Sequence, residues 1–148
     1  MALPASAFST PHMRIGVLCD HAMFSKDDKL SIMGIFDRIT VPGVPVQHPH
    51  FFVVAVLDME PGTYTVRLEL LDPTGSNVLQ DQGVEIPLAV AYPGQSGNLV
   101  AELNMLPLEF VGVYHFNLHV GEAKIGTITL NVDLGQAPGM GDQPFGQV

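Results

Sequence analysis

Residues 63–75 read TYTVRLELLDPTG, and this stretch decides the fold class. Between Thr63 and Leu71 the apolar side chains occupy every second position, which places them on one face of a β-strand. The tetrapeptide 72–75 then has Asp first, Pro second and Gly fourth, as a type I turn requires. A half-buried strand that ends in a tight turn is typical of an antiparallel sheet. The side chains expected to point inward are Tyr64, Val66, Leu68 and Leu70.

The same pattern recurs on both sides of this stretch. Residues 51–57 (FFVVAVL) are apolar on both faces and predict a central strand that is covered on both sides. Residues 41–49 (VPGVPVQHP) hold three prolines, so we expect a fixed, extended connection without ladder pairing. Pro87 inside a strand pattern indicates an edge strand or a bulge. The expected strands are 13–23, 29–36 with an extension over 39–41 past a kink near Asp37, 51–57, 63–71, 78–80, 84–90, 99–105, 112–120 and 124–132.

Eight or nine short strands separated by turns predict an all-β, single-domain antiparallel β-sandwich of the immunoglobulin-like or Greek-key kind. A closed barrel is the alternative, because strand number and spacing do not separate the two architectures. In the strand over 112–120 we expect Tyr114, Phe116, Leu118 and Val120 to point inward, and His115, Asn117 and His119 outward. The domain is expected to span residues 13–132, between a flexible tail at 1–12 and a disordered Gly/Pro/Gln-rich tail at 133–148.

The composition limits the classes of function. The chain has 148 residues and a net charge of −9, so it cannot line a phosphate backbone and is not expected to bind nucleic acid. No apolar run approaches the length that spans a bilayer, so membrane insertion is not expected. Only 14% of the residues are charged while 47% are hydrophobic, which indicates that some apolar surface is buried against a partner or a second copy.

No catalytic or cofactor-binding motif is visible, so we do not expect an enzyme, a catalytic residue or a cofactor. The single cysteine, Cys19, lies in an apolar strand pattern, where cysteine acts as a small hydrophobe. Its isolation, together with the lack of a secretory signal pattern at the start of the sequence, predicts a cytoplasmic location.

Two groups of residues are candidate metal ligands. Asp20, Asp27, Asp28 and Asp37 lie near predicted turns, and carboxylates at one end of a sandwich can hold calcium; their spacing matches no calcium loop, however, and Asp is common in turns for its own hydrogen bonds. His48 and His50 flank Pro49 and could hold a metal with Cys19 and His21 only if the fold brought them together. We therefore assign no metal site from the sequence.

Strand edges of a thinly charged sandwich are candidate docking surfaces. The segment with Pro87 suggests one such edge, and we take Leu88 and Val90 as its interaction residues.

Two segments carry a resemblance to known proteins. Leu18-Cys19-Asp20-His21-Ala22 with KLSIMGIFDRI at 29–39 resembles the opening of a family of short bacterial proteins known only as a domain of unknown function. Residues 112–116 (GVYHF), followed by Gly121, are similar to the closing hairpin of that family. The resemblance covers about residues 13–132 and implies a β-sandwich, with no activity or catalytic residue attached.

Two functions from different classes follow. The first is a non-catalytic interaction or structural module that self-associates or docks a protein partner. The alternative is a ligand-binding domain that holds calcium or a small molecule in acidic loops at one end of the sandwich.

Overall fold

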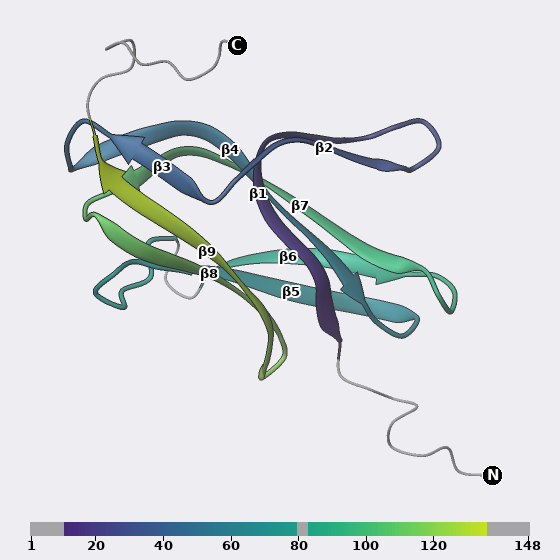
Figure 1. Cartoon of the computed structure of the whole chain (residues 1–148). Helices are drawn as coiled ribbons and strands as arrows, with labels where there is room; N and C mark the ends of the chain where they lie inside the picture. Colours follow the sequence, from purple (N-terminus) through teal and green to yellow (C-terminus); the bar gives the residue numbers. More distant parts are fainter. Residues whose placement is uncertain (1–10, 80–82, 136–148) are drawn as a thin grey trace.

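The computed structural model describes residues 11–79 and 83–135, and within them it has nine strands and no helix (Figure 1). Consequently no helix in these residues is long and apolar enough to cross a membrane. The strands are β1 (His12–Phe24), β2 (Leu30–Phe36), β3 (Arg38–Val41), β4 (Val46–Asp58), β5 (Gly62–Leu71), β6 (Val84–Val90), β7 (Ser96–Leu108), β8 (Gly112–Val120) and β9 (Ala123–Leu134).

The strands form two separate sheets, which confirms the predicted sandwich over the barrel. Sheet A has the order β2-β1-β4-β7, and sheet B has the order β3-β9-β8-β5-β6. All pairings are antiparallel except that of β3 with β9, which is parallel. The kink at Asp37 explains this exception. There the chain crosses from sheet A to sheet B, so residues 38–41 pair with β9 instead of extending β2.

The main core lies between the two sheets and is built from the alternating inward positions of both. Tyr114, Phe116 and Leu118 of β8 are fully buried, as their alternation predicts. Phe51 of β4 meets the ring of Phe116 edge-on at 6.2 Å between centroids, a favourable aromatic geometry that joins the two sheets.

The run of residues 51–57 in β4 is buried along its whole length, which confirms the prediction of a central strand covered on both sides. Its odd-numbered side chains enter the main core. Two even-numbered side chains, Phe52 and Val54, enter a second, smaller core on the outer face of sheet A, which we call the second core. Its members are Cys19, Ala22, Phe52 and Val54, with Val17, Leu30, Ile32 and Val100 packed against them.

The β1–β2 hairpin covers the second core. β1 pairs with β4 only as far as Cys19, which lies opposite Phe52, and beyond that point it pairs with β2 alone. Figure 1 shows the β1–β2 hairpin turning away from the direction of β4. Leu30 and Ile32 of β2 then pack against the second core. Without the hairpin, the apolar side chains on the outer face of sheet A would be exposed to water. The hairpin buries them, which is favourable.

Besides the expected extension of the 29–36 strand over 39–41, which pairs with β9 in the other sheet, two further expectations about strands were wrong. Residues 46–50 are not an unpaired connection, because Val46 to His50 belong to β4 and pair with β7 on both sides of Pro49. The proline is tolerated because β1 no longer flanks β4 there, so β4 is an edge at this level. The short strand expected over 78–80 is also missing from the described residues, where only an isolated bridge joins Leu71 to Asn77; Gln80 lies outside them.

Tyr114 ties the start of β8 to the loop before it. Its hydroxyl donates to the carbonyl oxygen of Phe110 at 2.9 Å and accepts from the Phe110 amide at 3.2 Å. Burial raises the pKa of this hydroxyl, so it stays protonated and can donate. An equivalent tyrosine corner is common in immunoglobulin-like sandwiches.

Replacing Tyr114 with Phe keeps the ring but leaves both backbone groups of Phe110 without their partner. We expect the free energy of unfolding to fall by about 1–3 kcal/mol and the melting temperature by roughly 2–10 °C, measured by urea and thermal denaturation. Tyr64→Phe is the matched control, because the Tyr64 hydroxyl bonds the Glu60 carbonyl at an exposed site. Equal losses in the two variants would contradict this role of Tyr114.

Candidate functional site

The four predicted calcium ligands lie at different places along one hairpin. Asp20 lies partway along β1, Asp27 and Asp28 lie in the turn between β1 and β2, and Asp37 follows β2. Among residues 11–79 and 83–135, no three His, Cys, Asp or Glu side chains are grouped so that they could hold a metal ion. The fold therefore does not assemble the acidic set into a coordination sphere in this part of the chain.

The structure does bring two of these acids close to one predicted interaction residue. Asp27 and Asp28 line a surface hollow of about 690 Å³ together with Leu88 and Tyr92. The hollow lies between the tip of the β1–β2 hairpin and the β6–β7 loop, and the sequence could not indicate this proximity.

The predicted edge strand is confirmed, because β6 ends sheet B. Its two interaction candidates differ in position, however. Leu88 is half-buried against the main core, whereas Val90 is only 3% exposed and belongs to that core. The side chain of Val90 is therefore not available at the surface of the folded domain.

The histidine–cysteine site considered from the sequence is not formed either. The ring of His48 contacts Phe51 on the main-core side, and burial lowers its pKa. His50 contacts Phe52 on the other side and lies 2.6 Å from the Glu102 carboxylate. Cys19 is fully buried in the second core, and this burial raises the pKa of its thiol, which confirms its role as a small hydrophobe.

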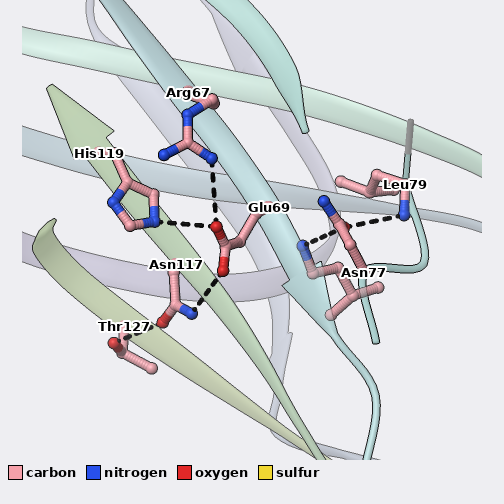
Figure 2. Close-up of polar contacts among 8 residues, drawn as sticks. Arg67, Glu69, Asn77, Leu79, Asn117, His119 and Thr127 are labelled. Atoms are coloured by element: carbon pink, nitrogen blue, oxygen red, sulfur yellow. Dashed lines mark hydrogen bonds and ion pairs between the residues drawn. The ribbon is translucent and has the colours of Figure 1, made fainter. Parts of the chain in front are cut away.

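A polar cluster lies on the outer face of sheet B, across three neighbouring strands (Figure 2). Asn117 of β8 lies opposite Glu69 of β5 on one side and opposite Thr127 of β9 on the other. Thr127 donates to the Asn117 side chain at 2.8 Å, and Asn117 donates to Glu69 at 3.3 Å. Arg67 donates to the other Glu69 oxygen at 3.2 Å. This row buries Asn117 to 5% exposure, although its alternation correctly predicts an outward direction.

His119 completes the cluster. Its Nε2 atom lies 3.1 Å from Glu69 Oε1, within ion-pair distance but without hydrogen-bond geometry, and it is shielded from solvent. The hydroxyl of Thr127 donates to Asn117 and not to this histidine. Alternation alone could not reveal the cluster, because its members meet only through the register of β5, β8 and β9.

Glu69 is the electrostatic centre of this cluster. Burial tends to raise its pKa, but the Asn117 hydrogen bond, the His119 charge and the Arg67 contacts outweigh it, so the pKa is lowered. These neighbours stabilise the ionised carboxylate in the folded state.

A second feature is apolar and lies on the β1–β2 hairpin. Met23, Phe24, Met33 and Ile35 are 50%, 46%, 59% and 63% exposed, and we call these four residues the hairpin surface. They belong to the same hairpin whose Leu30 and Ile32 pack on the second core. The sequence pattern does not reveal this surface, because exposed and buried apolar residues of the hairpin look alike as strand positions.

Comparisons with known proteins give a family and a structural likeness. Residues 14–133 match the model of a family described as a family of unknown function (DUF6941). This match confirms the resemblance deduced from residues 13–132. No curated protein matches the sequence. Among solved structures, an immunoglobulin-like protein from Pseudomonas aeruginosa is 13% identical, with 85% of this chain and 98% of that chain covered and a TM-score of 0.41.

Protonation of Glu69 at low pH should lower the free energy of unfolding. Because its pKa is lower in the folded than in the unfolded state, its contribution is present above the unfolded value of about 4.3 and is lost as the pH falls through the folded pKa. We expect Glu69→Gln to be less stable than the wild type at pH 7 and to lose less stability on acidification. Urea midpoints at several pH values measure this. Glu122→Gln, in the β8–β9 turn, is the control, and an unchanged pH slope in Glu69→Gln would refute the assignment.

Metal ions should leave the fold unchanged. A ligand that binds only the folded state raises the melting temperature by mass action, and the described residues offer no grouped ligands for calcium or zinc. We expect identical melting curves with millimolar calcium, with zinc and with EDTA. A calcium-dependent rise that Asp27→Asn abolishes would instead establish a site at the hairpin tip.

Proposed function

We propose, for a chain that belongs to the family of unknown function DUF6941, a non-catalytic role as an interaction module that associates with a second copy of itself. The observation that carries this proposal is the hairpin surface, where four large apolar side chains are exposed on one hairpin. Met23 lies opposite Ser31, which places Met23, Met33 and Ile35 on one face of the hairpin, whereas Phe24 lies opposite Leu30 on the other face. Apolar side chains scattered singly over a surface need no explanation, but a group of them on one face marks a site of association.

The composition of this surface suits protein contact. Two of its four members are methionines, whose flexible thioether side chains adapt to the shape of a partner. The strand β2 reads LSIMGIF and carries no charged residue. A charge-free contact avoids the cost of desolvating ions when the partner excludes water.

The hairpin is also held in place before any partner binds. Ala22, Leu30 and Ile32 pack on the second core, so the exposed side chains sit on a supported framework. A preorganised surface loses less conformational entropy on association than a mobile loop does. We place this activity in the cytoplasm. The single cysteine is buried and free, and thiols stay reduced in that compartment.

The ligand-binding alternative finds support in the hollow lined by Asp27, Asp28, Leu88 and Tyr92. The hollow holds a single pair of adjacent acids, so we rank this function second. The melting curves described above test its calcium form.

Lysine at the centre of the hairpin surface should disrupt assembly. Burying one such side chain contributes about 1.5–3 kcal/mol, so Met33→Lys and Ile35→Lys should each weaken association about tenfold or more. Size-exclusion chromatography with light scattering over a concentration series measures this. Val113→Lys is the matched control, because Val113 is 41% exposed on sheet B.

A wild-type protein that stays monomeric at the highest concentration would overturn the proposal. Leu88→Lys tests the competing edge at β6. If that variant alone loses the assembly while both hairpin variants keep it, the contact lies at β6 instead.

A further inference from the structure

We infer that the second copy pairs along the free edge of β2, so that two sheets A join into one continuous antiparallel sheet about a twofold axis at Met33. This inference rests on the proposed function and specifies its contact. It requires an edge open to pairing, a self-complementary register and compatible charges at its ends.

The edge of β2 is the least protected of the four sheet edges formed by the described residues. β6 carries Glu85 and Pro87, and β3 has four residues, with Arg38 in it and Pro42 directly after it. Charges, prolines and short lengths are the devices that keep edges from pairing. β2 has none of them over its seven residues.

The remaining edge, β7, is protected too. It contains the charged residue Glu102 and Pro107. A charge and a proline are two of the devices that keep an edge from pairing. β2 is thus the edge at which another strand can add with least hindrance.

The register follows from symmetry. A twofold contact is isologous, so residue i meets residue j and j meets i. Only one antiparallel register overlaps all seven residues of β2 with themselves, and it places Met33 opposite its own counterpart. The other facing pairs are Leu30 with Phe36, Ser31 with Ile35, and Ile32 with Gly34.

Gly34 does not interrupt this register. Its φ is 74°, yet the register of β2 with β1 does not shift at this residue. Cys19 lies opposite Ile35 and His21 lies opposite Met33, so two residues of β1 match two residues of β2. No residue is therefore inserted at Gly34. Because no extra residue interrupts β2, its free edge can pair with a second β2 along the full strand.

The register also makes the ends of the contact complementary in charge. Lys29 directly precedes β2 and Asp37 directly follows it, so each Lys29 faces Asp37 of the second copy. Symmetry gives this pair twice. Two copies of net charge −9 repel each other overall, and a contact whose immediately flanking charges, Lys29 and Asp37, are opposite in sign reduces that cost locally. An arbitrary apolar strand would lack this match, which favours a second copy as the occupant.

The exposed side chains of β2 then find partners. Met33 meets the Met33 of the second copy, and Ile35 lies beside Ser31 of that copy. Both apolar side chains are more than half exposed in the single chain. Facing side chains on paired strands have Cβ atoms about 4.5–5.5 Å apart, which is contact distance.

Cysteine cross-linking tests the register in the full-length chain. In a Cys19→Ala background, Met33→Cys should form a disulfide-linked dimer under mild oxidation, because a residue on the axis faces itself within reach of a disulfide. Ser31→Cys alone and Ile35→Cys alone should not cross-link, since each would lie about 14 Å from its own counterpart at ~3.4 Å per residue. The double variant Ser31→Cys with Ile35→Cys should cross-link again. Non-reducing electrophoresis and mass spectrometry detect the cross-linked dimer, whose mass is twice 15.9 kDa.

A charge exchange is the second test. Lys29→Asp or Asp37→Lys alone should weaken the dimer roughly 2- to 10-fold, as expected for two exposed ion pairs that become repulsive, and the double exchange should restore it. A dimer that cross-links only through another position, or that ignores the charge exchange, overturns the β2 register but leaves the proposed function standing. A wild-type monomer, or one that binds only a foreign apolar peptide, overturns both.

Discussion

Burial of both faces of β4 is the constraint on which the rest of the structure depends. Residues 51–57 carry no polar side chain, so each face of this strand must be covered. Sheet B covers one face, where Phe51 meets Phe116. The outer face of an ordinary sandwich sheet meets water, and here Phe52 and Val54 need a cover of their own.

The β1–β2 hairpin supplies that cover, and its surface properties follow from the same arrangement. To reach the outer face of sheet A, β1 leaves β4 after Cys19 and carries β2 with it. One set of hairpin side chains is then buried in the second core, while Met33 and Ile35 are left in water. The far edge of β2 is free because β2 is the last strand of sheet A. The hairpin surface, to which we assign the function, is therefore a consequence of covering both faces of β4.

Periodicity gave correct strands wherever one face was apolar and the other polar, as in 63–71 and 112–120, because a period of two fixes the direction of each side chain. Periodicity was insufficient where neighbouring strands decide whether a residue pairs or is buried. Pro49 lies within β4 because no strand flanks that side at its level. Periodicity gave the outward direction of Asn117 correctly but not its burial, because Glu69 and Thr127 from two other strands cover this side chain. Val90 lies in the core although its strand is an edge.

By itself the sequence determined the fold class, most of the strands, the doubly buried run at 51–57, the edge position of the strand with Pro87 and the burial of Cys19. These are properties of local patterns, which depend on residues close together in the chain. The tertiary structure alone decided the parallel pairing of β3, the polar cluster around Glu69 and the exposure of Met33 and Ile35 on the hairpin. Each of these depends on which strands lie side by side and in what register, and contacts between residues far apart in the chain set that register.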